Sequence, residues 1–155
     1  FAESARYPYY FCKYWDREAE PMGQNSNQNY PYMRYSEVLL MYAEALNEVH
    51  DGPTTEAYDA INKVRNRAFK DNGSGEHALK GLDYKEFRKA ILDERRWELV
   101  LEGSRWFDLV RLSTDFATEI KRTKPDAYVE EKHKLYPIPQ YERLLNDRIT
   151  QNEGY

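Results

Sequence analysis

Cysteine is almost absent from this sequence, and it has neither long hydrophobic runs nor a stripe of charge of one sign. Cys12 is the single cysteine, so no disulfide can form within the chain and no thiolate cluster can hold a metal. The longest wholly apolar run is Val38–Ala43, far shorter than the roughly 20 residues that cross a bilayer as a helix. These absences exclude a disulfide scaffold and a membrane-spanning segment.

The charges are mixed, with 23 basic residues scattered among 27 acidic ones. Because phosphate backbones are bound by basic stripes, we expect no nucleic-acid partner. What the sequence does have is aromatic residues, among them 14 tyrosines and 3 tryptophans. The 155 residues suffice for one hydrophobic core, so we expect a single domain over residues 1–155.

The sequence begins at Phe1 with no initiator methionine, no basic stretch and no apolar signal segment. We therefore expect it to be a piece of a longer protein. Residues 1–33 are dense in Tyr, Pro, Asn and Gln, which predicts an irregular, aromatic-rich N-terminal segment. Within it, Tyr9–Trp15 is a candidate short strand.

From residue 34 onward, apolar residues recur at three- and four-residue spacing, which predicts helices. A helix over Arg34–Val49 is ended by Asp51-Gly52-Pro53 and followed by a second over Thr54–Phe69. Together these two helices form a helical hairpin.

A third and longest helix is predicted from Tyr84 to about Glu102, with Asp83 as its N-cap. Beyond Gly103 a fourth helix runs to about Ser113, either separate from the third or continuous with it through a kink. The last third of the chain predicts an extended tail, because prolines punctuate it, with one short helix over Gln140–Leu145. The predicted fold class is all-α.

Three stretches, Arg34–Ala45, Ile61–Arg65 and Glu94–Leu109, resemble in order and spacing the C-terminal signature of the SusD/RagB family. Leu135–Pro139 followed by Thr150–Tyr155 resembles the closing motif of that family. Four pieces in the right order make the resemblance specific.

The resemblance covers about Tyr30 to Tyr155. Two departures, Asp147 and Glu153, stand where the family usually carries proline, and they bear on the rigidity of the tail. The family fold is built around tetratricopeptide-like helix pairs, so the resemblance implies that residues 34–69 form one such pair.

The resemblance also implies a function. Family members are lipid-anchored on the outward face of the outer membrane and bind oligosaccharide or peptide nutrients for a SusC-like, TonB-dependent transporter. It implies a non-catalytic binding protein without a cofactor, whose membrane contact is a lipid anchor outside this sequence. Residues 34–155 would be the family signature region of such a protein.

Two other functions stay open. One is a tetratricopeptide-like adaptor that binds another protein, for which one hairpin is thin support. The other is a carbohydrate-active enzyme that uses Glu94 and Glu98, although two acids on adjacent turns of one helix make a poor cleft. Glu130-x-x-His133 is the only metal-ligand spacing, and one such pair does not make a site.

Carboxylates at four-residue spacing and nearby arginines predict structural ion pairs instead of acid/base chemistry. We expect a contact of Glu44 with one of these arginines to tie the hairpin to the long helix. The residues predicted to pair are Glu37, Glu44, Glu94, Arg95, Arg96, Glu98, Glu102 and Arg105, with Arg111 beside them.

Aromatic rings are the better candidates for ligand contact, because flat rings stack on the apolar faces of sugars. Those at helix-packing positions are predicted to be core residues: Tyr35, Tyr42, Tyr58, Trp97 and Phe107. Those in irregular sequence, where binding residues concentrate, are predicted to bind ligand: Tyr14, Trp15, Tyr30 and Tyr32.

Overall fold

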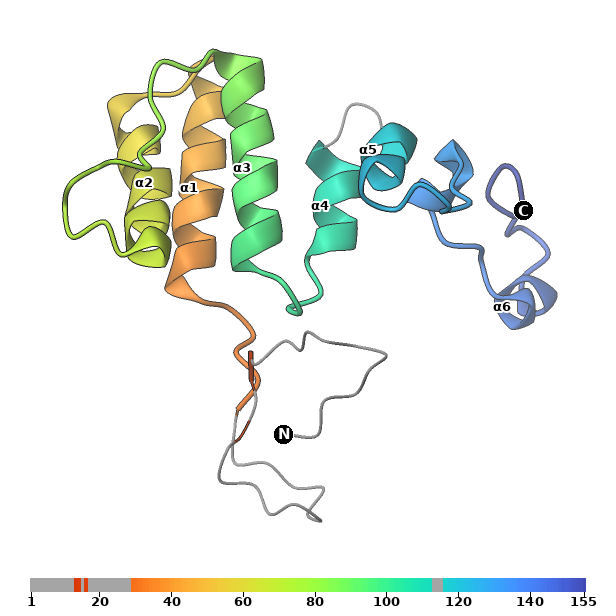
Figure 1. Ribbon diagram of the computed structural model, residues 1–155. Coiled ribbons are helices and arrows are strands. Elements are labelled where there is room, and N and C mark those ends of the chain that lie inside the picture. Colours follow the sequence, from red (N-terminus) through yellow and green to blue (C-terminus); the bar gives the residue numbers. More distant parts are fainter. Residues whose placement is uncertain (1–12, 15, 17–28, 113–115) are drawn as a thin grey trace.

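The computed structural model describes residues 13, 14, 16, 29–112 and 116–155, and every regular element among them is a helix. The prediction of an all-α fold is thus confirmed. In Figure 1, α1 lies between α2 and α3, α4 lies beside α3, and the later elements extend away from this bundle toward the C-terminus. The elements are α1 (Tyr35–Val49), α2 (Thr55–Phe69), α3 (Tyr84–Glu98), α4 (Arg105–Leu112), α5 (Phe116–Thr123), the 3₁₀ helix η1 (Glu131–Lys134) and α6 (Gln140–Leu145).

The main core lies among the first three helices. It holds the fully buried Leu40 from α1, Ile61 from α2, and Phe87 and Ile91 from α3. Because each helix presents apolar side chains at helical spacing toward the other two, the hairpin and α3 share one core. No described helix has the length and hydrophobicity that crossing a membrane requires.

Side chains fix where the helices begin. The Thr54 hydroxyl accepts a hydrogen bond from the backbone N–H of Ala57 at the start of α2. Asp83 caps α3 as predicted: it accepts from the N–H of Glu86 at 2.8 Å, and the Glu86 carboxylate accepts from the N–H of Asp83 at 3.0 Å. These bonds satisfy N–H groups that the first helical turn leaves without partners.

The third helix ends earlier than the sequence predicts. It stops at Glu98, and Leu101 and Gly103 take positive φ angles of 66° and 78°. Left-handed backbone breaks the helical ladder, so α3 and α4 are separate helices joined by a turn. Glu102 therefore lies in that turn and not on a helix.

A fifth helix was not anticipated by the sequence pattern. α5 presents Phe116, Ala117 and Ile120 to a second, smaller core that also contains Leu109 and Val129. The helix has only eight residues, so its periodicity is brief, and packing against α4 stabilises it more than its own propensity does.

Four of the five aromatic residues predicted to be core are exposed: Tyr35, Tyr42, Trp97 and Phe107. The prediction is wrong for these four residues. They lie on helix faces that no other described segment covers. Tyr58 does pack in the core, with its ring edge-on to Phe87 at 4.9 Å between centroids.

The C-terminal tail is held by hydrogen bonds instead of apolar burial. The Gln151 carboxamide exchanges two hydrogen bonds with the backbone of Ile138, at 2.8 and 3.0 Å. The Asn152 amide donates to the carbonyl of Tyr136 at 2.7 Å. The predicted strand over Tyr9–Trp15 falls outside the described residues, apart from Lys13 and Tyr14.

Candidate functional site

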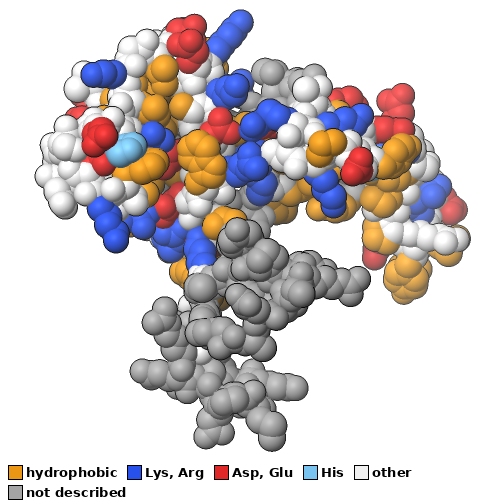
Figure 2. Space-filling view, in the orientation of Figure 1, with side chains coloured by type: hydrophobic (Ala, Val, Ile, Leu, Met, Phe, Trp, Pro, Cys, Tyr) orange, Lys and Arg blue, Asp and Glu red, His pale blue; other side chains and the backbone are white. Residues whose placement is uncertain are grey.

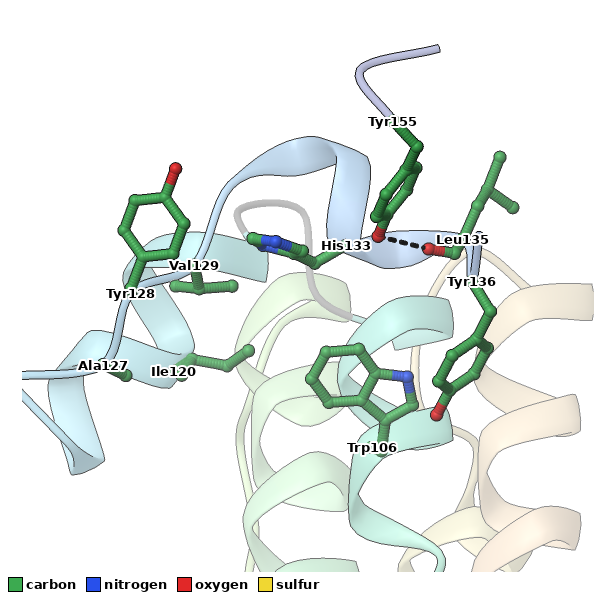
Figure 3. A pocket seen from close by; sticks show the side chains of 9 residues that line it. All are labelled: Trp106, Ile120, Ala127, Tyr128, Val129, His133, Leu135, Tyr136 and Tyr155. Carbon is green, nitrogen blue, oxygen red and sulfur yellow. Dashed lines mark hydrogen bonds between the residues drawn. The ribbon is translucent and has the colours of Figure 1, made fainter. Parts of the chain in front are cut away.

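An open, aromatic-lined pocket of about 340 Å³ lies where α4 and α5 meet the C-terminal tail. Its lining residues come from α4, α5, η1 and the segments around η1 and at Tyr155, and Figure 3 shows their side chains. We call it the aromatic pocket and define it by Trp106, Ile120, Ala127, Tyr128, Val129, His133, Leu135, Tyr136 and Tyr155.

Trp106 forms one wall of the aromatic pocket and packs against Phe116 of the small core. Its ring stands edge-on to the fully buried Phe116, with 5.2 Å between centroids and 86° between planes. On its other side it lies 6.4 Å from the ring of Tyr136, and Figure 3 shows the two rings next to each other. The tail motif Leu135–Pro139 thus supplies a ring against the ring of α4.

The opposite wall is organised by Glu130 at the start of η1. The backbone N–H of Glu130 donates to Nδ1 of His133 at 2.8 Å, so Nδ1 is the acceptor and the imidazole proton lies on Nε2. The Tyr128 hydroxyl donates to the Glu130 carboxylate at 2.5 Å. This hydrogen bond raises the pKa of Tyr128 and lowers the pKa of Glu130.

Tyr155 closes the top of the aromatic pocket. Its hydroxyl donates to the carbonyl of Leu135 at 2.9 Å, the bond drawn in Figure 3. Gly154 precedes it with φ of +87°, and a Cβ there would meet Lys132 Cδ at 3.0 Å. Glycine therefore lets the chain end approach η1 closely.

Flat rings with polar edges suit ligand stacking more than bond-making. The lining residues comprise three tyrosines, one tryptophan and a histidine, and aromatic faces bind the apolar faces of sugar rings or other flat groups. No group of three or more His, Cys, Asp or Glu side chains is placed to hold a metal in the part of the chain that the structure describes.

The residues predicted to bind ligand lie elsewhere. Tyr14 and Tyr30 are neighbours, with ring centroids 5.9 Å apart, and the Tyr30 hydroxyl donates to the backbone carbonyl of Glu102 at 2.8 Å. Tyr32 is almost fully exposed, and Trp15 falls outside the described residues. Tyr14 and Tyr30 therefore share a position beside the turn after α3, away from the aromatic pocket.

The two acids at the end of α3 bind the segment that precedes α1. The Arg34 guanidinium contacts Glu98 at 2.7 Å and Glu102 at 2.6 Å, and Lys13 also contacts Glu102. Arg67 of α2 contacts Glu98 from the other side. These ion pairs fasten α1, α2 and the preceding residues to one end of α3.

Neighbouring cations lower the pKa values of Glu98 and Glu102. Burial raises the pKa of Glu102, but hydrogen bonds from Arg34 and Lys13 outweigh burial and leave that pKa below its ordinary value. Glu98 behaves in the same way through Arg34 and Arg67. Glu94 contacts Arg65 at 2.7 Å, but burial outweighs this cation and leaves the pKa of Glu94 above its ordinary value.

A second set of ion pairs joins α1, α3 and α4. The buried Arg95 contacts Asp108 at 2.8 Å and Glu37 at 3.3 Å. Arg111 of α4 binds Glu44 of α1 with both of its terminal nitrogens, so Glu44 connects the hairpin to α4. Because several of these groups are buried, removing one partner would leave an uncompensated charge in the core.

The last two arginines that the sequence predicts to form ion pairs are Arg96 and Arg105, and only Arg105 does so among the described residues. Arg105 lies 3.5 Å from Glu119 of α5 and donates to the carbonyl of Leu92 at 3.2 Å. Arg96 forms no ion pair with another residue among those the structure describes. Glu94, Arg95 and Glu98 of α3 thus pair with residues of other segments.

Sequence reasoning did not identify the lining of the aromatic pocket. Tyr136 and Tyr155 belong to motifs that carry the family resemblance, and Tyr128 lies in the same proline-rich third of the chain. The sequence did contain a feature that could have indicated these residues as ligand contacts. Aromatic residues in extended, proline-flanked sequence cannot be core residues of a helix.

Comparison with known proteins gives a consistent result. The model of the SusD family matches residues 2–155. SusD-like protein P25 of Formosa agariphila is 37% identical over 155 residues, which cover 94% of this chain and 29% of that protein. The chain therefore spans less than a third of the length of this relative.

Solved structures agree. A crystal structure of a SusD homolog from Bacteroides thetaiotaomicron has a TM-score of 0.70 and 35% identity, covering 86% of this chain and 30% of that one. A SusD superfamily protein from Parabacteroides distasonis has a TM-score of 0.63 and 32% identity, covering 84% and 28%. As the motifs of the helices and tail predict, the chain belongs to the SusD family.

Proposed function

We propose that this chain is the C-terminal domain, over residues 1–155, of a non-catalytic nutrient-binding protein on the outward face of the outer membrane. The protein holds a glycan or another nutrient and hands it to a SusC-like, TonB-dependent transporter. It is attached to the membrane by a lipid anchor that lies outside this chain. Family membership is the observation that carries the proposal.

The aromatic pocket supports a role in binding. Its rings can stack on a ligand, and Nδ1 of its imidazole, His133, already accepts a hydrogen bond from the backbone N–H of Glu130. The carboxylates that an enzyme would need, Glu94 and Glu98, are bound to arginines. This distribution of groups supports the proposal of ligand capture without turnover.

Within the described residues, we assign ligand contact first to Tyr136 and Tyr128 of the aromatic pocket. Tyr14, Trp15, Tyr30 and Tyr32 stay a separate prediction, which concerns the other end of α3. The two predictions name different rings, so mutations distinguish them.

The experiment is a binding screen on the full-length protein, encoded by the complete gene. Native gels are cast with and without a soluble polysaccharide. The retardation of migration by the polysaccharide is measured for wild type, Tyr136→Ala and Tyr141→Ala. Tyr141 on α6 is the matched control, because both tyrosines are 68% exposed and only Tyr136 lines the aromatic pocket.

We expect one glycan class to retard the wild type and the control, with retardation lost in Tyr136→Ala and with no shorter sugars released. Equal retardation of Tyr136→Ala would remove the aromatic pocket from the function. Release of shorter sugars would overturn the non-catalytic assignment.

A tetratricopeptide-like adaptor is the second candidate, and the packed helices α1, α2 and α3 favour it. It predicts that the full-length protein binds no glycan. Co-purification from detergent-solubilised outer membranes separates the two, because only the nutrient-binding protein should bring down a large TonB-dependent transporter.

A further inference from the structure

One wall of the aromatic pocket is aliphatic. Ile120 of α5, Ala127 and Val129 form it, and Val129 is buried in the small core with Phe116. Figure 3 shows Ile120 and Val129 across the pocket from Tyr136. Aliphatic side chains form no hydrogen bonds, so a ligand hydroxyl against this wall would lose its bonds to water without replacement. The wall therefore favours an apolar ligand group, such as a methyl group.

His133 supplies a hydrogen-bond donor to the same pocket. Its Nδ1 accepts from the backbone N–H of Glu130 at 2.8 Å, so its proton lies on Nε2. Nε2 has no hydrogen-bond partner in the part of the chain that the structure describes, and it is open to solvent. The rings of Tyr128 and Tyr155 stand edge-on to the imidazole, with 5.8 and 6.3 Å between centroids, and hold it in place. A ligand acceptor can therefore bind Nε2 without any rearrangement of the ring.

The lining offers few acceptors. Among the described residues it contains no carboxylate, carboxamide or aliphatic hydroxyl side chain, although these groups are the usual partners of sugar hydroxyls. The hydroxyl protons of Tyr128 and Tyr155 are donated to Glu130 and to the carbonyl of Leu135, which leaves the two tyrosine oxygens as acceptors. A ligand group that fits the pocket thus has an apolar end, one strong acceptor oxygen and a single donor.

We propose that the aromatic pocket recognises sugars that carry an acetamido group, an inference that rests on the glycan-binding function proposed above. The methyl group packs against Ile120 and Val129, and the carbonyl oxygen accepts from Nε2 of His133. The single amide N–H donates to the oxygen of Tyr155, and the sugar ring stacks on Tyr136, which is 68% exposed. An acetamido group is a common sugar substituent that combines a methyl, a carbonyl and one N–H.

The size and the surroundings of the pocket suit one sugar residue of a longer glycan. Its volume of about 340 Å³ lies at the lower end of the range of ligand pockets, about 300–1,000 Å³. Figure 2 shows hydrophobic side chains, which include tyrosines, at the surface of the C-terminal end, and Tyr128 is 78% exposed. A peptide group has the same donor and acceptor, but exposed rings beside the pocket favour the flat apolar face of a sugar ring.

Calorimetry on the full-length protein with two matched oligosaccharides tests the proposal. N-acetylchitotetraose and cellotetraose have the same chain and linkage, and they differ in carrying an acetamido group or a hydroxyl at one position of each ring. We expect the dissociation constant of the acetylated ligand to be lower by about tenfold or more, because one carbon in an apolar pocket gives about 10–200-fold discrimination.

Two substitutions of His133 give an independent readout. In His133→Asn the side-chain oxygen can still accept from the N–H of Glu130, but the donor at Nε2 is lost, so the preference for the acetylated ligand should fall about fivefold. In His133→Gln the side-chain amide reaches the position of Nε2 and should restore most of the preference. His50→Asn, at an exposed histidine after α1, is the matched control and should leave both dissociation constants unchanged.

Equal dissociation constants of the two oligosaccharides for the wild type, or tighter binding of cellotetraose, would overturn the proposal and leave the glycan-binding function intact. The same conclusion holds if neither binds while the gel screen finds another glycan, whereas absence of binding to every glycan overturns both. An unchanged preference in folded His133→Asn also overturns the proposal, and so does equal competition by N-acetylalanine amide, which would mark a peptide site. If His133→Asn does not fold, the wild-type comparison decides.

Discussion

The helical bundle of α1, α2 and α3 and the C-terminal third of the chain are stabilised in different ways. The bundle has a core of fully buried side chains that include Leu40, Ile61 and Phe87. The C-terminal third has only the small core of Leu109, Phe116 and Val129; residues 131–155 contain no buried residue, and hydrogen bonds from Gln151 and Asn152 hold the tail in place. A small core and a few hydrogen bonds stabilise a fold less than a large core does, so the two regions should open at different free energies.

The difference in stabilisation corresponds to a difference in which side chains each region exposes. The bundle holds its helices together with a shared core and a buried ion pair between Arg65 and Glu94. The C-terminal third keeps its aromatic side chains Tyr128 and Tyr136 at the surface, where they can contact a ligand. Under the proposed function, the bundle is the scaffold and the exposed rings are the ligand contacts.

The largest expected effect comes from deleting a core ring in each region. Phe87→Ala in α3 should destabilise the protein by about 3–5 kcal/mol, since the residue is fully buried and a cavity would replace it. Phe116→Ala in α5 is the matched comparison, because that ring is equally buried but belongs to the small core. Hydrogen exchange with mass spectrometry measures where each variant opens.

We expect Phe87→Ala to accelerate exchange in α1, α2 and α3 together. Phe116→Ala should accelerate exchange in α4, α5 and the tail and leave the bundle protected. If both variants accelerate exchange uniformly over the chain, the two regions fold as one cooperative unit and the comparison fails.

The second effect concerns the ion pairs at the end of α3. Arg34→Ala leaves Glu98 and Glu102 without a shared cation, which should cost about 2–3 kcal/mol. Arg34→Lys keeps the charge but loses the planar fork that reaches both acids, so it should recover only part of the loss. Urea unfolding of the three proteins gives the free energies, and a loss below about 0.5 kcal/mol for Arg34→Ala would mark these pairs as ordinary surface contacts.

The helices of the bundle were predictable because their periodicity is long. α1, α2 and the start of α3 agree with the sequence to within a residue, since each has four turns of apolar spacing and α2 and α3 have a capping residue. The end of α3 was not predictable, because Leu101 adopts a left-handed conformation that its residue type disfavours.

The site was harder to predict than the fold. The sequence predicts ion pairs between helices, with Glu37 and Glu44 as partners, but it does not identify Arg34 as the partner of Glu98. The aromatic pocket combines Trp106 with Tyr155, and no local pattern indicates that these two residues meet. Contacts between distant segments depend on tertiary packing, which periodicity does not encode.

Acid should act on the bundle through the same ion pairs. Glu98 and Glu102 have folded pKa values below the ordinary value of 4.5, so their stabilisation is complete above that pH and is lost as pH falls below it. Glu94 acts in the opposite direction but at higher pH, because its raised pKa makes folding favour its protonation while pH falls toward 4.5. Below about pH 4.5 the loss at Glu98 and Glu102 remains, so we expect stability to fall there.

The measurement is the melting temperature of wild type and Glu102→Gln from pH 7 to pH 3. The variant lacks one titrating group, so the difference between the two proteins should be constant above pH 5 and shrink below about pH 4.5. A difference that stays constant over the whole range would show that protonation of Glu102 is not linked to folding.

The smallest effect tests Lys70 at the end of α2, three residues beyond Arg67, which pairs with Glu98. Lys70 follows the helix with φ of 57°, a left-handed conformation that costs a residue with a Cβ roughly 1 kcal/mol or more. Lys70→Gly removes that cost but increases the freedom of the unfolded chain, so the net gain should be about 0.5 kcal/mol. Lys89→Gly, an exposed position inside α3, should instead lose about 1 kcal/mol, because glycine weakens a helix interior. Urea unfolding should therefore give opposite signs for the same substitution, and a loss at both positions would mean that residue 70 does not adopt the left-handed conformation in solution.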